Sequence, residues 1–139
     1  MLSFFADSAE VPAFVVENED KLTRWIRSVA ASYGFSTGNI NYIFCNDERI
    51  LAVNRQFLSH DYYTDIITFD YSTPTCIAGD IFISLDTVRS NAEDAGCSFQ
   101  QELCRILIHG VLHLTGQGDK TPETKAEMTR KEDLALSQL

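Results

Sequence analysis

The sequence lacks the features that mark membrane proteins, secreted proteins and repeat proteins. None of its apolar runs approaches the ~18 residues that a membrane-spanning helix needs. Residues 1–7 contain no basic side chain and end on Asp7, so they do not resemble a secretory signal. No internal repeat or linker interrupts the 139 residues. We therefore expect one domain spanning residues 1–139, in the cytoplasm and without a membrane partner.

Closely spaced cysteines are also missing. The chain has four cysteines, and the closest two, Cys97 and Cys104, stand seven positions apart. Seven residues of helix separate two side chains by ~10 Å, which is too far for a disulfide. Without a CxxC pair, neither a zinc knuckle nor a redox motif is predicted. Free, buried thiols are the expected state of all four residues.

Positive charge is scarce as well. The chain has 11 Lys and Arg and 20 Asp and Glu, which gives a formal net charge of −9. This balance argues against a broad basic face that holds duplex DNA, but it leaves open a local positive cleft for RNA. Residues that can form a hydrophobic core are plentiful, since 45% of the chain is hydrophobic and 11% is aromatic. That composition is typical of a packed globular domain.

The hydrophobic pattern predicts an α+β domain with a small mixed β-sheet flanked by helices. Strands are expected at residues 13–16, 40–45, 65–71 and 77–84, and the last two read as an antiparallel hairpin. Helices are expected from Asn18 to Gly34, from Asn46 to Leu58, from Ser84 to Gly96, from Ser98 to the glycines at 116 and 118, and over 123–138. Ser98 and Gln101 form a capping-box pair. Met128, Leu134 and Leu136 form the apolar stripe of the last helix.

Two of the three histidines stand four positions apart on one predicted helix, as His109 and His113. Side chains at i and i+4 share a helix face, so both imidazoles can reach one ion. Gly116 and Gly118 then end the helix, and Asp119 follows with a carboxylate. Two His and one Asp would form an open tripod, which is the pattern of a catalytic metal site.

Two other interpretations of these residues stay open at this point. Two helix histidines can occur together by chance and be satisfied by core hydrogen bonds, and an Asp after Gly is common in loops. A zinc peptidase of the HExxH class shares the histidine spacing, but its general base is the Glu that follows the first His. Gly110 occupies that position here, so peptide hydrolysis by that mechanism lacks its base.

The segment from His109 to Gly116, HGVLHLTG, resembles the HGxLHLxG motif of the YbeY family of bacterial endoribonucleases and ribosomal RNA maturation factors. The resemblance extends to Thr64–Phe69, which is similar to the family's TDVLSF strand, and to Gly79–Ser84, which is similar to its GDI strand. Glu127, Met128, Glu132 and Leu136 match the family's spacing in the last helix.

This resemblance implies a zincin-like metal-binding helix and a metal-dependent hydrolase. It implies a zinc-dependent single-strand endoribonuclease that processes the 3′ end of small-subunit ribosomal RNA and acts in ribosome quality control. Its partners would be ribosomal RNA and the ribosome or ribosomal proteins. One Zn²⁺ per chain would be held by His109, His113 and Asp119. The alternatives are a non-catalytic ribosome-assembly factor with a structural metal and a metallopeptidase.

The sequence departs from the family pattern at two places. The family motif continues to a third His, and ungapped counting puts Asp119 at that position, beside Lys120, whose amine would have to lose a proton to bind metal. The family also has a functional Arg where this chain has Leu58. Arg55, one turn earlier, is the candidate replacement, and a solvated surface charge is its alternative role.

Overall fold

The computed structural model describes residues 1–6, 16–58 and 66–139. The strands are β1 (Leu2–Ala6), β2 (Ser36–Cys45), β3 (Ile66–Asp70) and β4 (Cys76–Ser84). The helices are α1 (Glu19–Ser32), α2 (Asp47–Val53), α3 (Leu85–Ala95), α4 (Phe99–Leu114) and α5 (Pro122–Ser137). A short π-helix, η1 (Asn54–Leu58), continues α2.

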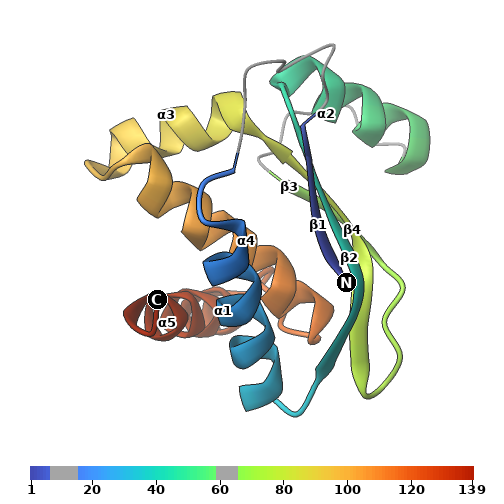
Figure 1. Ribbon diagram of the computed structural model, residues 1–139. Helices are drawn as coiled ribbons and strands as arrows, with labels where there is room; N and C mark the ends of the chain where they lie inside the picture. Colours follow the sequence, from blue (N-terminus) through green and yellow to red (C-terminus); the bar gives the residue numbers. More distant parts are fainter. Residues whose placement is uncertain (7–15, 59–65) are drawn as a thin grey trace.

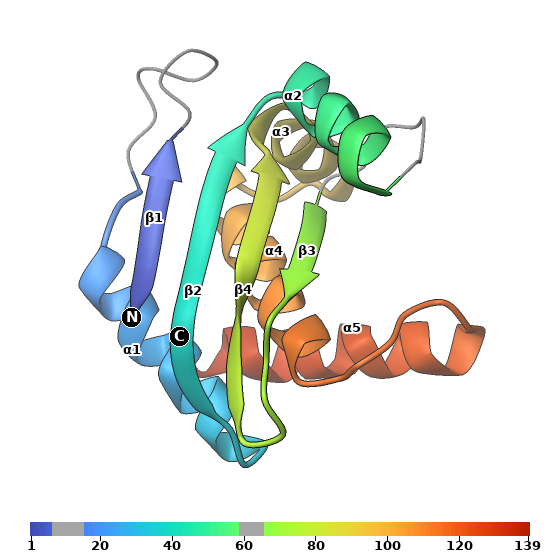
Figure 2. The ribbon, with the colours of Figure 1, turned by 90° about the vertical axis from the view of Figure 1, so that its right-hand side faces the viewer.

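The four strands form one mixed sheet in the order β1-β2-β4-β3 (Figure 2). β1 is parallel to β2, with Phe4 opposite Tyr42, and β2 is parallel to β4. β3 is antiparallel to β4, with Thr68 opposite Ile81. This arrangement confirms the predicted α+β class, the mixed sheet and the hairpin of its last two strands.

One face of the sheet carries the main core. Alternate residues of the two central strands point to this face and are fully buried, among them Ile40, Tyr42 and Ile81. Helices α1, α4 and α5 lie on that side of the sheet (Figure 1). The hydroxyl of Tyr42 donates to the backbone oxygen of Leu107 at 2.9 Å, which ties β2 to the middle of α4. The position of α4 is therefore set by the sheet.

The opposite face is covered at one end by α2, which Figure 1 places across the sheet from α1. Ile50 and Val53 of α2 pack there with Cys45 and Ile67, and Phe69 and Phe82 lie against them. The helix begins at Asn46, whose side chain accepts a hydrogen bond from the backbone N–H of Arg49. The predicted helix from Asn46 is confirmed, although its second half is a π-helix.

Helix α5 is held between α4 and α1. The indole N–H of Trp25 in α1 donates to the backbone oxygen of Ala135 at 2.8 Å, and Met128 and Ala135 are buried. Leu134, predicted for the apolar stripe, is 50% exposed. That part of the prediction was wrong because α5 buries the face carrying Met128, Glu132 and Ala135, and Leu134 lies off that face.

The start of the chain differs from the prediction. The first described strand is β1, at Leu2–Ala6, where no strand was predicted, and α1 separates it in the sequence from its partner β2. Of the strand expected at 13–16, residues 13–15 lie outside the described residues and Val16 is in no strand. β1 was missed because it is a short edge strand, and its parallel partner β2 lies beyond α1 in the sequence.

The predictions about helix ends and cysteines are confirmed in part. Ser98 and Gln101 form the predicted capping box at the start of α4. Asn18 precedes α1 as expected, but its backbone is left-handed and its side chain caps nothing. All four cysteines are free thiols, with Cys45 and Cys104 buried. Across the described residues, no helix has the length and apolar character required to cross a membrane.

Candidate metal centre

Helix α4 carries both histidines on the one face that the core does not enclose. Its apolar side chains are buried, and Leu107, Ile108 and Val111 are fully so. His109 and His113 retain side-chain exposures of 21% and 27%. Because residues four apart share a helix face, the packing that buries the rest of α4 leaves both imidazoles partly exposed on the same side of the helix.

The end of α4 brings the third residue back toward the histidines. Gly116 has a φ of +99° and follows the last helical turn. The N–H of Gly116 donates to the oxygen of His113, and the N–H of Gln117 donates to the oxygen of Leu112. This pattern is a Schellman motif, in which a glycine in the left-handed region reverses the chain. The reversal places Asp119 beside the helix face that it has just left.

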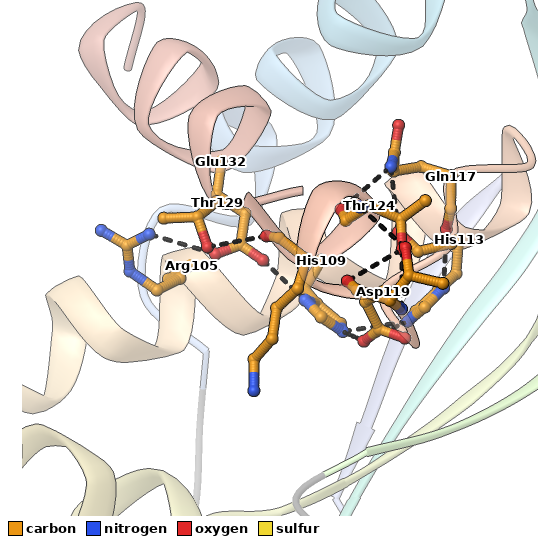
Figure 3. Close-up of polar contacts among 11 residues, drawn as sticks. Arg105, His109, His113, Gln117, Asp119, Thr124, Thr129 and Glu132 are labelled. Atoms are coloured by element: carbon orange, nitrogen blue, oxygen red, sulfur yellow. Dashed lines mark hydrogen bonds and ion pairs between the residues drawn. The ribbon is translucent and has the colours of Figure 1, made fainter. Parts of the chain in front are cut away.

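The three predicted ligands meet at one point (Figure 3). The Nε2 atoms of His109 and His113 lie 3.0 Å apart. The Asp119 Oδ2 atom lies 3.4 Å from each of them. The sequence spacing therefore predicted a cluster that the fold does assemble.

The other nitrogen of each imidazole determines which atoms face this point. The Nδ1 atom of His113 lies 3.0 Å from the backbone oxygen of Gln117, which can only accept, so Nδ1 carries the proton. The Nδ1 atom of His109 lies 2.6 Å from the Glu132 carboxylate, which accepts in the same way. With the proton on Nδ1, a neutral imidazole presents its lone pair at Nε2, and both Nε2 atoms lie beside the Asp119 carboxylate.

Two Nε2 atoms and a carboxylate oxygen in mutual contact repel one another unless a proton or a metal cation lies between them. For a tetrahedral ion with ligand distances of ~2.0–2.1 Å, the ligand atoms would lie about 3.3–3.4 Å from one another. The separations of 3.0 and 3.4 Å are close to that value. Burial, with a smaller contribution from His109, lowers the pKa of His113 and so favours the neutral form that binds metal. These residues fit a metal ion.

A second set of side chains supports the cluster from α5. Glu132 is almost fully buried and accepts from His109 with one oxygen and from Arg105 with the other, at 3.1 Å. Arg105 also donates to Asp133 at 2.9 Å. Such outer carboxylates fix the tautomer and orientation of metal-binding histidines. Sequence analysis assigned Glu132 no role, and only its match to the family spacing pointed to it.

Gln117 anchors the loop that carries Asp119. Its side-chain nitrogen donates to the backbone oxygen of Gly118 at 2.9 Å and to that of Thr124 at 3.3 Å. Its side-chain oxygen accepts from Lys131 at 2.7 Å. These contacts join the loop to α5, so the position of Asp119 depends on the docking of α5 against α4.

The structure does not bring together all the residues singled out in the sequence. Arg55 lies in η1, and that element contributes none of the described residues that line the pocket around His109. Leu58 is the last residue of η1, and Thr64 and Asp65 lie outside the described residues. Lys120 is exposed and belongs to neither the ligand cluster nor the lining of that pocket.

A pocket of about 200 Å³ adjoins the cluster. Its lining comes from α4, from α5 and from the loop between them, and it consists of Glu102, Arg105, Ile106, His109, Asp119, Lys125, Met128, Thr129 and Glu132. A larger pocket of about 380 Å³ lies between Cys97 and the C-terminal Leu139. The larger one contains none of the three clustered ligands, so chemistry rather than volume identifies the site.

Gly110 explains why the peptidase Glu is missing. A Cβ atom at this position would lie 3.0 Å from the Ile81 side chain and 3.2 Å from that of Ile66. Position 110 therefore faces the sheet at close range, and α4 packs there because no side chain intervenes. A carboxylate on this residue would have no room, which argues against a peptidase mechanism of the HExxH type.

Comparison with known proteins identifies the family of the chain. The family model described as Endoribonuclease YbeY matches residues 7–139. The chain belongs to the YbeY family. A protein of Parabacteroides distasonis named Endoribonuclease YbeY is 50% identical over 136 residues, covering 98% of this chain and 94% of that protein. One of Bacteroides thetaiotaomicron with the same name is 57% identical over 115 residues, covering 83% of this chain and 84% of that protein.

The fold of a more distant protein is also similar. The solution structure of a Thermotoga maritima protein matches with a TM-score of 0.67 and 22% identity, covering 99% of this chain and 87% of that one. At this identity the match shows the fold alone. The resemblance seen in the sequence motifs is thus confirmed as YbeY family membership, and the HGVLHLTG segment supplies both histidines of the cluster.

Proposed function

We propose that this chain is a metal-dependent endoribonuclease that cleaves single-stranded RNA in the maturation of ribosomal RNA, with one Zn²⁺ held by His109, His113 and Asp119. The observation that carries the proposal is the convergence of two imidazole lone pairs and a carboxylate oxygen on one point. Its relatives carry the name Endoribonuclease YbeY. By its family, we further propose cytoplasmic action with ribosomes on the 3′ end of small-subunit RNA, and in ribosome quality control.

An open coordination sphere supports catalysis over a purely structural metal. Among the described residues, no fourth His, Cys, Asp or Glu joins the cluster. Structural zinc sites are usually closed by four protein ligands, whereas catalytic sites keep a position for water or substrate. A divalent ion there would supply Lewis-acid activation and neutralise charge on a phosphodiester. Such an ion would add a local positive charge to an acidic chain.

The residues of the chain have separate tasks in this proposal. His109 and His113 present neutral Nε2 atoms, and Asp119 adds one negative charge to the ligand set. Glu132 and the backbone oxygen of Gln117 hold the Nδ1 protons and so prevent each ring from turning its lone pair away. The alternatives of a structural metal in an assembly factor and of a metallopeptidase predict different outcomes in the test.

The test combines metal analysis with RNA cleavage. The purified chain should contain about one zinc per molecule and should cut a single-stranded fragment spanning the 3′ end of precursor small-subunit RNA, and a chelator should abolish the cutting. His113→Ala and Asp119→Ala should each lose metal, whereas the exposed neighbour variant Lys120→Ala should retain it. Full zinc content without RNA cleavage would favour the structural role, and chelator-sensitive peptide cleavage would favour the peptidase.

If Lys120→Ala loses the metal and Asp119→Ala does not, the assignment of the third ligand is wrong. Circular dichroism provides the folding control for each variant. Helix content should be unchanged in His113→Ala, because α4 is held by buried residues such as Leu107 and Val111.

A further inference from the structure

The pocket beside the proposed metal ligands contains one basic side chain, Lys125, that no other described residue engages. Lys125 lines this pocket together with His109 and Asp119. Its side chain forms no ion pair or hydrogen bond with any part of the chain that the structure describes. The other basic residue of the lining, Arg105, is engaged by Glu132 and Asp133. The Lys125 ammonium is therefore available to a ligand.

The position of Lys125 in its helix is locally unfavourable. It is the fourth residue of α5, which begins at Pro122 after the Thr121 cap. The amino-terminal end of a helix is its positive end, where acidic residues are favoured and a lysine is not. When a side chain goes against such a helix preference and has no partner within the protein, a functional role is one reason for its presence. An anion in the pocket would supply the missing partner.

The charges around the pocket show which anion fits. The charged lining residues are three acids, Glu102, Asp119 and Glu132, and two bases, Arg105 and Lys125. Counted over these lining residues alone, without the Asp133 carboxylate that pairs with Arg105, the formal charge is −1, and a divalent ion would make it +1. Replacing Lys125 with a neutral residue would cancel that positive charge. An anion with a single negative charge, such as a phosphodiester, matches the loaded pocket.

The size of the pocket limits what it can hold. Pockets that enclose whole drug-sized ligands have volumes of roughly 300–1,000 Å³. This one has about 200 Å³ and opens to solvent through exposed residues such as Lys125 and Thr129. It therefore suits one phosphate group of a chain that continues outside, and not a complete nucleotide.

We infer that this pocket is a phosphodiester subsite for single-stranded RNA, in which Lys125 pairs with a backbone phosphate next to the metal ligands. The identity of the anion rests on the proposed nuclease function. Lysine binds phosphate as a compact point charge, so the contact is independent of base sequence. Lys125 supplies this cation from the first turns of α5.

The test measures binding separately from cleavage. The zinc-loaded chain is titrated with a short single-stranded RNA in which every 2′-hydroxyl is methylated, and the RNA is checked for integrity afterwards. Lys125→Met should weaken binding about threefold to tenfold, the range for one partly exposed charged contact. The slope of log affinity against log salt should decrease by about 0.7, the value for one phosphate contact on a single strand. Zinc content should equal that of the wild type, and Lys125→Arg should restore most of the affinity.

Lys120→Met is the matched control, because it removes the same charge from an exposed residue next to Asp119 that does not line the pocket. Its effect on affinity should be less than about twofold, as for a charge acting only through the general field. Equal losses in the two variants, or wild-type binding by Lys125→Met, would overturn the subsite.

The remaining outcomes separate the two proposals. If unmodified RNA is cleaved but the effect of Lys125→Met equals that of the control, the subsite is wrong and the nuclease function stands. Lys125-dependent binding without any cleavage of unmodified RNA would refute the nuclease and retain the subsite. A wild-type chain that binds no RNA refutes both.

Discussion

Replacing Glu132 with Gln would isolate the carboxylate that orients His109. The Glu132 side chain is 8% exposed and accepts from His109 Nδ1 at 2.6 Å and from Arg105 at 3.1 Å. Glutamine keeps the shape but has one acceptor oxygen, and its amide nitrogen can only donate. If the glutamine oxygen accepts from Arg105, the glutamine NH2 group faces the Nδ1–H of His109, and two donors then oppose each other. The imidazole would then favour a proton on Nε2 and lose the lone pair that binds metal.

The expected loss in metal affinity is 10–100-fold, the usual effect of removing such an outer carboxylate. This corresponds to about 1.4–2.7 kcal/mol. Competition against a chromophoric chelator measures it directly, with circular dichroism as the folding control. Asp133→Asn is the matched variant, because it removes the other carboxylate partner of Arg105 and leaves the His109 contact. Wild-type zinc affinity in Glu132→Gln, or an equal loss in Asp133→Asn, would refute the orienting role.

Three further predictions concern packing, chain reversal and metal linkage. Gly110→Ala should lower the free energy of unfolding in urea by about 1 kcal/mol. Overpacking against Ile81 costs about 1–3 kcal/mol, and the higher helix propensity of alanine offsets about 1 kcal/mol of this cost. A stabilised variant would contradict the close packing of α4. Gly116→Ala should cost about 1–2 kcal/mol, since its φ of +99° disfavours any side chain, and no clash adds to this. Zinc at about 100 times its Kd should stabilise the wild type by about 2.7 kcal/mol. The same zinc should leave the melting temperature of His113→Ala unchanged, and an equal shift in both would place the metal elsewhere.

Local geometry made the cluster of His109, His113 and Asp119 predictable from the sequence. Residues four apart share a face of any helix, so His109 and His113 had to lie together once the segment was helical. Gly116 marks the helix end because only glycine enters the left-handed region at little cost. The capping box at Ser98 and Gln101 and the β3–β4 hairpin were predicted for the same reason, since their partners are near in sequence.

Contacts between distant segments could not be predicted in this way. The strand β1 was missed because a short edge strand is recognisable mainly by its parallel neighbour β2. Leu134 was assigned to the core because a helical stripe alone does not say which of two adjacent faces will be covered. The identity of the covered face depends on how α5 docks on α4 and on Trp25 of α1.

Two imidazoles and a carboxylate on a short local segment were enough to predict, from the sequence alone, a cluster of possible metal ligands and a family. The residues that surround this cluster became known from the fold. Glu132 reaches His109 across 23 positions. Lys125 enters the same pocket wall from α5. Both depend on how two helices pack, and packing is set by the summed burial of many side chains, which no local pattern encodes.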